Sequence, residues 1–529
     1  MTNNPSTVAG PAPNRVNNGT SVASGPAHPA GRLVVASETT KAGLSRQAKA
    51  GNAFRVAPNV YIVGSALAPE QAVAYHRLAI INVFWPGAVL SDRSALTGGI
   101  PFEGWIFVTH PDPARRSDLE LTGVTVSPRV GPGPLPGDTQ LPEGLHVSGL
   151  ARRLVENVSV AGRPPRGRPN RQAGTEAVED EIDQLARRGG AGSIQNVLNQ
   201  LDMIAGQLPA GPVKAVRRRL AAVLGSFTEV KPTSGRLAAR LAGQPYDEHR
   251  LSMFRALAEL LGETAPEPRP ALGSAQRWTW EPFFEAYFSN FIEGTEFGVD
   301  EARQIVVDGV ISAQRPADAH DVSATFRIVS DPASNALAPA SGDDFINELR
   351  DLHAILMDAR PEKRPGEFKV RRNYAGGYAF VEPDLVVGTL RRGFDIFSSV
   401  TDPLQRAVAL MLLVTECHPF DDGNGRLARI VSNGVLSAAG QVRIVVPTVY
   451  RNNYLAGLAG VSNGNGRGES LIAVLRFAQR WTGAIDWTTF EAADEEMRKL
   501  DAYMDPGLAE ASGIRLRLPE SSSSSIVSA

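Results

Sequence analysis

The chain of 529 residues is poor in cysteine, in net charge and in long apolar runs. Its one cysteine, Cys417, excludes an internal disulfide and a cysteine-based zinc site. Because Cys417 stands in an apolar helix end, we interpret it as a buried packing residue rather than a nucleophile. A net charge of −2 provides no overall field that would attract nucleic acid. No apolar run approaches the roughly 20 residues of a membrane-spanning helix, and the N-terminus lacks a signal-peptide pattern, so we expect a cytoplasmic protein without a membrane partner.

The most informative stretch is residues 418–429, which read HPFDDGNGRLAR. An apolar run after Pro403 predicts one buried helix, and a second helix is predicted from Gly425 to Gly440. The glycines between them let backbone N–H groups face outward from a helix N-terminus, which favours an anion such as phosphate. Arg426 and Arg429 are three residues apart, so they share one helix face and could hold further phosphate oxygens.

Two more residues of this stretch suggest catalysis. Asp422 is an oxygen ligand suited to Mg²⁺, which keeps several waters and binds through one or two carboxylates together with phosphates. His418 ends the first helix and is the nearby group that titrates near neutrality, which makes it the candidate general base. Each feature alone has a commonplace explanation, as a helix terminus, a turn or a solvated arginine face. Eight specified positions between two predicted helices together indicate a phosphate-binding catalytic site.

This stretch resembles the signature of the Fic (Fido) family, HxFx(D/E)GNGRxxR, at every defining position. Members of that family commonly transfer AMP from ATP to a hydroxyl of a protein target. The resemblance implies that His418 deprotonates the hydroxyl, Phe420 anchors the loop, Asp422 holds Mg²⁺, Gly423, Asn424 and Gly425 form the anion hole, and Arg426 and Arg429 bind the β- and γ-phosphates. These roles agree with the residues' own chemistry, since positioning and charge neutralisation supply most of the catalysis in such displacements.

A second motif lies upstream, in the aromatic segment from Trp280 to Gly294. Pro282 near its start and the glycine at its end predict a helix. Ser289 and Glu293 share one face of it, where a carboxylate ordinarily meets water. The segment from Ser289 to Gly294 resembles the (S/T)xxxE(G/N) inhibitory motif of Fic proteins, which implies that Glu293 pairs with Arg429 in the place of the γ-phosphate. We therefore expect an enzyme held inactive at rest. The same glutamate lets some relatives also remove AMP, which leaves the direction of the reaction open.

Two further segments belong to the same resemblance. Residues 366–372 and 377–383 flank Gly376–Gly377 and predict a hairpin, which corresponds to the flap that grips a target segment as an added strand. The predicted docking residues are Lys369, Val370 and Arg371, with Lys369 where the family often has arginine. The resemblance places Asn453 and Tyr454 near the adenine, and the alternative is that they cap and pack.

The N-terminal part carries less specific signals. Residues 1–38 are rich in Asn, Pro, Gly, Ser and Ala and are expected to be disordered. Residues 39–158 predict a helix, a strand pair and further short strands, an α/β winged-helix-like pattern. The segments RVAPNVYIVG, AVLSDRSAL and GLHVSGLARRLVENV resemble AbiEi-type antitoxin proteins, so this region either binds DNA or a partner protein, or is retained as a scaffold. Residues 159–262 are interpreted as an arginine-containing linker followed by helices, with phosphate contact by the arginines as the alternative.

The length predicts roughly three domains, with a Pro-rich boundary at 263–276. We expect a mainly α-helical Fic-fold catalytic domain with a β-hairpin flap over residues 277–482, its inhibitory helix at 277–294, and a helical extension with a disordered Ser-rich tail over 483–529. The predicted function is autoinhibited transfer of AMP from ATP, with Mg²⁺, to a Ser, Thr or Tyr hydroxyl of a protein target, which includes the chain itself as a candidate. The alternatives are a DNA-binding regulator of toxin–antitoxin type, and a Fic transferase that uses another nucleotide or a phosphocholine-type donor. The sequence identifies neither the target, nor the oligomeric state, nor whatever displaces Glu293.

Overall fold

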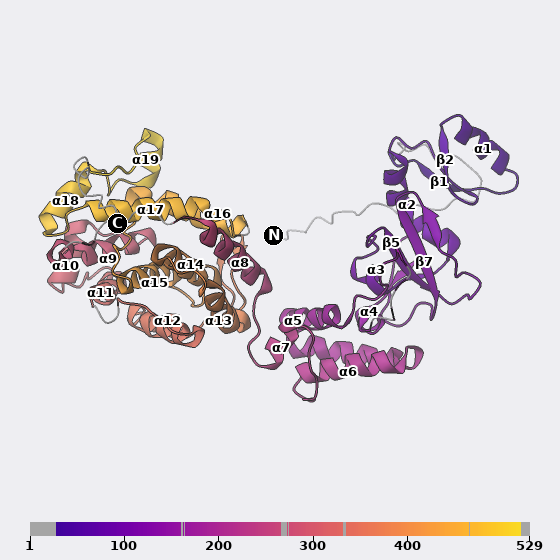
Figure 1. Ribbon diagram of the computed structural model, residues 1–529, viewed down its shortest axis with the longest axis horizontal. Helices are drawn as coiled ribbons and strands as arrows, with labels where there is room; N and C mark the ends of the chain where they lie inside the picture. The colour runs from indigo at the N-terminus through magenta and orange to yellow at the C-terminus, as the bar shows by residue number, and fades with distance from the viewer. Residues whose placement is uncertain are drawn as a thin grey trace, which may run out of the picture. The chain divides into compact units, whose positions relative to one another are not determined.

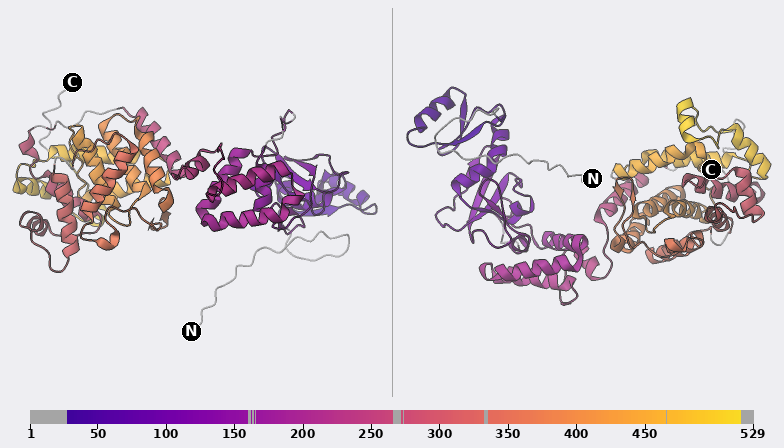
Figure 2. Two further views of the ribbon diagram at one scale, coloured as in Figure 1. Left: turned by 90° about the horizontal axis from the view of Figure 1, so that it is seen from below. Right: turned by 180° about the vertical axis from the view of Figure 1, so that it is seen from behind.

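The computed structural model describes residues 28–519, apart from 160–161, 163, 165, 266–271, 273, 332–334 and 465. The chain forms two compact units, Met1–Leu241 and Ala242–Ala529 (Figures 1 and 2). The tails predicted to be disordered lie outside the described residues at 1–27 and 520–529. Within the described part, no helix combines the length and apolarity that crossing a membrane requires.

The N-terminal unit begins with a small antiparallel sheet in the order β1-β3-β2. Its strands are β1 (Arg32–Val35), β2 (Ala53–Ala57) and β3 (Val60–Val63), and α1 (Lys41–Lys49) precedes the β2–β3 hairpin. The predicted helix and strand pair are thus confirmed. The prediction of disorder up to residue 38 is wrong, because all four residues of β1 pair with β3. Composition alone missed this strand, since it is short and stands among small and polar residues.

A six-stranded mixed sheet follows, in the order β6-β7-β5-β4-β9-β8. Its strands are β4 (Val89–Leu90), β5 (Trp105–His110), β6 (Leu119–Leu121), β7 (Val124–Val130), β8 (Thr139–Gln140) and β9 (His146–Val147), with α3 (Asp92–Leu96) after β4 and α4 (Leu150–Asn157) after β9. α2 (Pro69–Phe84) buries Val73 and Ile80 in a core shared with Ile106 and Val126 of the sheet. Burial of these apolar side chains holds the helix on the sheet.

The segment after α4 is not the free linker that its prolines and arginines predicted. Arg171 donates through Nε to the Asp92 carboxylate at 3.1 Å and through its Nη atoms to the carbonyl oxygens of Ser127 and Val108. Asp92 is fully buried. Arg171 therefore supplies, together with Arg129, the positive charge that a buried carboxylate needs, and it is committed to the fold rather than to a phosphate backbone.

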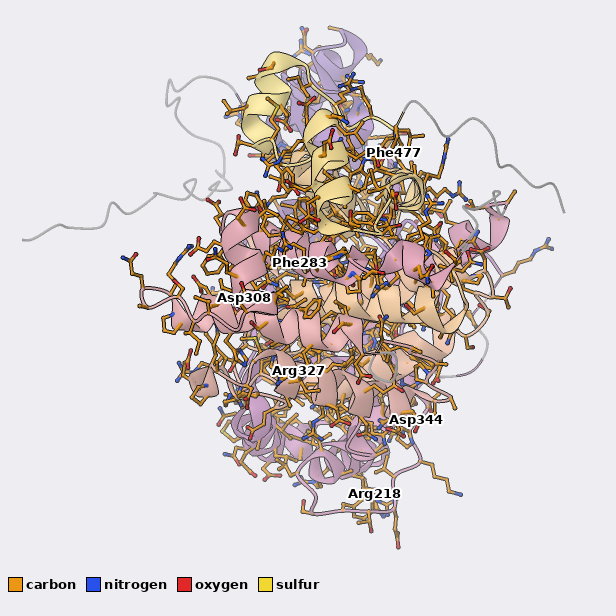
Figure 3. The ribbon with its side chains drawn as sticks, turned by 90° about the vertical axis from the view of Figure 1, so that its left-hand side faces the viewer. Arg218, Phe283, Asp308, Arg327, Asp344 and Phe477 are labelled. Atoms are coloured by element: carbon orange, nitrogen blue, oxygen red, sulfur yellow. The ribbon has the colours of Figure 1, made fainter. Side chains whose placement is uncertain are left out.

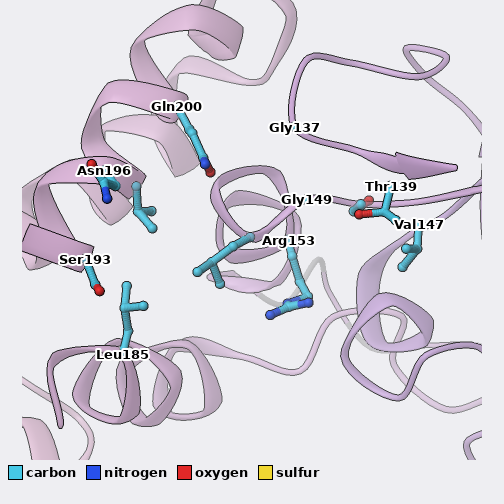
Figure 4. Close-up of a pocket in the computed structure, with 12 residues that line it drawn as sticks. Gly137, Thr139, Val147, Gly149, Arg153, Leu185, Ser193, Asn196 and Gln200 are labelled. Carbon is cyan, nitrogen blue, oxygen red and sulfur yellow. The ribbon is translucent and has the colours of Figure 1, made fainter. Parts of the chain in front are cut away.

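Three helices complete this unit, namely α5 (Thr175–Ile204), α6 (Ala210–Val223) and α7 (Gly235–Leu241). Gly190 interrupts α5 with φ 58° and ψ −158°. A pocket of about 350 Å³ lies between α4 and α5, and Arg153, Ser193 and Gln200 are among its lining residues (Figure 4). The Arg153 guanidinium already pairs with Glu181, so we assign no ligand to this pocket.

The C-terminal unit is helical and is built around α14 (Pro403–Cys417) and α15 (Asn424–Ala438), which pack on each other and are joined by the motif loop (Figure 1). α14 starts with Pro403 in its first turn and with the Asp402 side chain accepting from the Gln405 N–H at 3.0 Å. α8 (Glu248–Glu263) and α13 (Val386–Phe397) pack on α14, while α11 (Pro316–Ser330) and α12 (Gly342–Leu356) pack on α15. The other elements are α9 (Glu281–Ile292), α10 (Val299–Val307), β10 (Tyr374–Ala375), β11 (Tyr378–Ala379), α16 (Arg451–Asn463), α17 (Glu469–Ala484), α18 (Phe490–Lys499) and α19 (Pro506–Ser512).

Three details of this unit differ from the sequence prediction. α8 belongs to it, although the expected boundary lay after this helix. α11 lies in a segment rich in Ala, Pro, Ser and Asp, residues 313–343, for which the sequence predicted no helix. Pro316 stands in its first turn, where proline is tolerated, and Val322 and Ile328 are buried. In the flap hairpin β10 and β11 pair over two residues each, and β10 lies after the predicted segment 366–372 rather than within it.

The predicted inhibitory helix α9 is an interior element of this unit. Phe283 (Figure 3) and Phe284 pack against Phe490, and Phe284 also packs against Trp487. The described part of the predicted C-terminal extension therefore contributes to the same core as α9. An undocked α9 would expose this aromatic cluster, at a cost of roughly 1.5–3 kcal/mol for each large side chain.

Two buried glutamates fix α9 from its N-terminal half. Glu281 and Glu285 share one partner, Arg443, whose Nη1 lies 2.9 Å from the Glu285 carboxylate and whose Nη2 contacts Glu281. Burial raises the pKa of Glu281 to about 8 and also raises the pKa of Glu285. One arginine thus faces two carboxylates, so one of the pair holds a proton near neutral pH.

Candidate active site

His418 stands at the carboxyl end of α14 in a left-handed conformation, with φ 45° and ψ 60°. Its ring Nδ1 lies 3.2 Å from the carbonyl oxygen of Thr415. Because a carbonyl oxygen only accepts, the neutral ring carries its proton on Nδ1 and keeps a lone pair on Nε2. Burial lowers the pKa of His418 to about 4. The imidazole is therefore neutral at physiological pH and able to accept a proton.

Phe420 and Asn424 fix the loop between the two helices. Phe420 is fully buried. The Asn424 side-chain amide accepts from the Phe420 backbone N–H and donates to the Phe420 carbonyl oxygen, both at 2.9 Å. The Asn424 side chain is thus used inside the loop, which leaves its backbone N–H for an anion. Gly423 has φ 73°, and a Cβ there would lie 2.9 Å from Met357 Sδ, so the tight approach of this loop requires glycine.

Asp422 carries a half-exposed carboxylate in the loop. Its Oδ1 accepts from the Gly423 N–H at 2.7 Å, and Oδ2 lies 3.3 Å from Lys363 Nζ. Although burial raises it, the pKa of Asp422 is lowered overall by Gly423 and Lys363, so the group is ionised at neutral pH. A single half-exposed carboxylate fits a Mg²⁺ ion that completes its shell with water and phosphate oxygens. Within the described ranges no three His, Cys, Asp or Glu side chains form a ready-made metal cluster.

Glu293 lies at the end of α9, directly against this loop. Its Oε1 accepts from Nη2 of Arg429 at 2.7 Å. Arg429 is buried and also donates to Ser289, to Oγ at 2.9 Å and to the carbonyl oxygen at 2.8 Å. A Cβ on Gly425 would meet Glu293 Oε1 at 2.2 Å. The structure thus brings Ser289, Glu293 and Arg429 together, and it puts the carboxylate at the α15 N-terminus, where the helix favours an anion.

Arg426 has a different partner from Arg429. Its Nη1 lies 2.7 Å from Asp321 Oδ2 and 3.3 Å from Asn290 Oδ1. Asp321 is buried and also pairs with Arg360. The buried Nε of Arg426 has no hydrogen-bond partner in the described part of the chain. A phosphate bound by Arg426 would therefore share its guanidinium with Asp321.

The two residues predicted on the adenine side differ in exposure. Tyr454 is 1% exposed, and the Arg429 guanidinium lies 5.8 Å from its ring. Asn453 is exposed. The structure places Tyr454 beside Arg429, the arginine that pairs with Glu293, and adenine binding by Asn453 or Tyr454 stays a prediction.

The three predicted docking residues also divide. Lys369 is buried, and its Nζ donates to Asn373 Oδ1 at 2.7 Å and to the Cys417 carbonyl oxygen at 3.2 Å. Burial lowers the pKa of Lys369 to about 8. Val370 and Arg371 are exposed. Lys369 thus ties the flap to α14, and docking of a target by these three residues stays a prediction. Cys417 is buried and free, as its packing interpretation required.

Sequence reasoning missed His353 in α12. Its Nε2 donates to the Asp422 carbonyl oxygen at 3.1 Å, its Nδ1 accepts from the Gly366 N–H at 3.0 Å, and its ring stacks on Phe420 at 3.7 Å. Burial lowers the pKa of His353 to about 4, which keeps this ring neutral. A histidine inside an apolar helical pattern gave no signal in one sequence, because its partners are 13 and 69 residues away along the chain.

Residues 345–436, which include the motif loop, match the model of the Fic/DOC family. This chain therefore carries a Fic/DOC family domain, with the mainly helical fold expected for it.

The curated relatives that this chain matches include proteins named as adenylyltransferases. "Protein adenylyltransferase fic-1" of Caenorhabditis elegans is 24% identical over 184 residues, which cover 33% of this chain and 36% of that protein. "Protein adenylyltransferase Fic" of Drosophila yakuba is 27% identical over 218 residues, covering 40% and 43%. The chain thus spans about two fifths of the length of the curated relatives it matches.

Solved structures with some similarity include Fic-1 from C. elegans, with a TM-score of 0.34 and 15% identity over 61% of this chain and 88% of that one. Another is IbpAFic2 covalently tethered to Cdc42, with a TM-score of 0.28 and 14% identity over 58% and 88%.

Proposed function

We propose that this protein transfers AMP from ATP to a Ser, Thr or Tyr hydroxyl of a protein target, and that Glu293 holds it inactive at rest. The observation that carries the proposal is the neutral His418 ring beside the N-terminus of α15, where Arg429 is already holding a carboxylate. The names of the relatives support the same chemistry.

In the proposed reaction the target hydroxyl oxygen attacks the α-phosphorus of ATP. Its proton passes to Nε2 of His418, the new P–O bond forms, and the bond to pyrophosphate breaks. The backbone N–H groups at Gly423–Gly425 and the Arg429 guanidinium would hold phosphate oxygens. Mg²⁺, bound through Asp422, would neutralise phosphate charge. Whether the same site also removes AMP remains part of the proposal, because His418 and Asp422 would serve in either direction.

Glu293 blocks this arrangement by charge and by position. The Glu293 carboxylate pairs with Arg429 and lies against Gly425. A γ-phosphate approaching Arg429 would therefore meet a negative charge already bound there. ATP bound around this obstacle would have its α-phosphate displaced from in-line attack, and a displacement of about 1 Å is enough to cost roughly 10²-fold in rate.

Transfer of label from α-phosphate-labelled ATP, with Mg²⁺, tests the chemistry. In Glu293→Gly protein we expect labelling of the chain itself or of a protein in a lysate of its own cells, and we expect the added change His418→Ala to reduce that rate by about 10²-fold, the contribution of a general base. ATP affinity, measured in parallel, should stay the same in both proteins.

The matched control is His249→Ala in the same Glu293→Gly background, because His249 is exposed on α8. Absence of labelling in Glu293→Gly protein that still binds ATP would refute AMP transfer. Competition by other nucleoside triphosphates would then test for a different donor.

DNA binding by the N-terminal unit is a second candidate function. Basic residues outnumber acidic ones in this unit, and the reverse holds in the C-terminal unit, a division that the net charge of the whole chain conceals. Lys214, Arg217 and Arg218 are exposed along α6. Retardation of duplex DNA by the full chain, weakened by raised salt and by Lys214→Ala/Arg218→Ala, would support this function; unchanged DNA mobility would exclude it.

A further inference from the structure

A buried charge lies two residues before His418. Glu416 is fully buried, and its carboxylate accepts from the Tyr378 hydroxyl at 2.5 Å and from the Ser462 hydroxyl. Arg250 Nε lies 3.2 Å from the same carboxylate. A carboxyl group in the interior must be paired and hydrogen-bonded to be stable there, and Tyr378, Ser462 and Arg250 provide these partners for Glu416.

The same arginine also holds the flap. Arg250, from α8, donates through Nη2 to the carbonyl oxygen of Ala379 at 2.7 Å, and its guanidinium lies 4.8 Å from the centre of the Tyr378 ring. Both contacts fall on β11, which pairs with β10 over two residues only. A hairpin this short is marginal by backbone pairing alone, so its position depends on side-chain anchors. The Arg250–Glu416–Tyr378 network provides them from α8 and α14.

The residue after β11 contacts the catalytic ring. Phe380 stacks on the His418 imidazole with 3.8 Å between ring centres and 10° between planes. The hydrogen bond to the Thr415 carbonyl oxygen holds the His418 ring at Nδ1. This one bond leaves the ring free to rotate about it, and the stacked Phe380 ring limits that rotation. The plane of the imidazole is therefore set by where β11 lies.

We propose that Arg250, Glu416 and Tyr378 are positioning residues, which clamp β11 so that Phe380 holds the His418 ring with Nε2 directed into the site. This inference deepens the proposed function, because it rests on His418 as the general base. The Arg250–Glu416–Tyr378 network would then position both the flap, along which a target docks, and His418, the base that deprotonates the target. Loosening the network would impair proton transfer while leaving the phosphate-binding groups of α15 intact.

A pair of tyrosines on one hairpin tests this proposal. Tyr378→Phe removes the hydroxyl that Glu416 binds, whereas Tyr374→Phe makes the same chemical change at a residue that is 61% exposed on β10. Both changes are made in the full chain with Glu293→Gly. The accessibility of His418 is measured as its rate of modification by diethyl pyrocarbonate, resolved by peptide mass spectrometry. His353, fully buried with both ring nitrogens engaged, serves as an internal reference for an intact fold.

For Tyr378→Phe we expect at least threefold faster modification of His418, unchanged His353, ATP affinity within about twofold, and AMP transfer about tenfold slower. Tyr374→Phe should match the parent in the modification rates of His418 and His353 and in ATP affinity. Equal His418 reactivity in the two variants would overturn the proposal, and this comparison holds whether or not any variant transfers AMP. If Tyr378→Phe exposes His353, and so disturbs the fold, Arg250→Lys provides the second test. It keeps the charge beside Glu416 but loses the fork that reaches Ala379, and unchanged His418 reactivity in that variant would equally overturn the proposal.

Discussion

Replacing Glu293 by glycine is expected to raise AMP transfer by roughly 10³-fold and to lower the stability of the protein at the same time. The gain follows because the change removes a negative charge from the proposed γ-phosphate position and frees Arg429, and a single misdirected phosphate or oxyanion contact is worth about 10²–10³ in rate. The loss follows because Arg429 is buried and would lose its carboxylate partner, although its two bonds to Ser289 would remain. We expect it to be about 1 kcal/mol, less than for a fully buried pair, since the Glu293 side chain is 35% exposed.

The two effects have opposite signs, which makes the combination diagnostic. Label transfer and thermal unfolding would be measured on the same preparations, with and without Mg²⁺ and ATP. Because the phosphates of bound ATP would replace the negative charge of Glu293 beside Arg429, ATP should raise the melting temperature of Glu293→Gly protein more than that of the wild type. Glu296→Gly is the matched control, since Glu296 is an exposed glutamate three residues further on. A stable but still inactive Glu293→Gly protein would contradict the proposed inhibition.

Arg443→Met is expected to destabilise the protein by about 3–5 kcal/mol, the usual cost of removing one partner from a buried ion pair. Glu281 and Glu285 would lose their shared cation in the middle of the core that α9 forms. Thermal or denaturant unfolding of the full chain measures this loss. Arg498→Met provides the control, because Arg498 is a half-exposed arginine paired with Asp494 on α18 in the same unit. Equal stability of the two variants would mean that the Arg443 contacts do not hold α9.

The same cluster predicts a dependence of stability on pH. The pKa of Glu281 is raised from an ordinary value of 4.5 to about 8 in the folded protein, so between these values the folded state binds a proton that the unfolded state has released. Stability should therefore fall as pH rises through this range, by up to about 1.4 kcal/mol per pH unit, and level off above pH 8. Glu281→Gln should flatten this slope and stabilise the protein at pH 8, whereas Glu259→Gln, at an exposed site on α8, should keep the slope of the wild type. A wild-type slope of zero from pH 5 to 8 would contradict the assignment.

Sequence alone determined the features whose causes are local. Asp402 and Pro403 start α14, and glycines occur in the loop before α15. The motif with His418, Asp422 and Arg429 can be recognised from local sequence spacing alone. Local composition also misled in two places. β1 is too short to stand out from its surroundings, and α11 lies in an Ala-, Pro-, Ser- and Asp-rich segment for which no helix was predicted.

Tertiary structure alone decided which of these groups are free to act. Arg426 and Arg429 look equivalent on one helix face, but Asp321 engages the first and Glu293 the second. Lys369 remains a predicted docking residue, but the structure shows that its Nζ lies inside the protein, on the Cys417 carbonyl oxygen. The anchors of the site, His353 and the Arg250–Glu416–Tyr378 network, come from helices and strands far apart in the chain. A single sequence shows the spacing of residues along one helix, but the pairing of buried charges depends on which helices meet, and that is fixed only when the core packs.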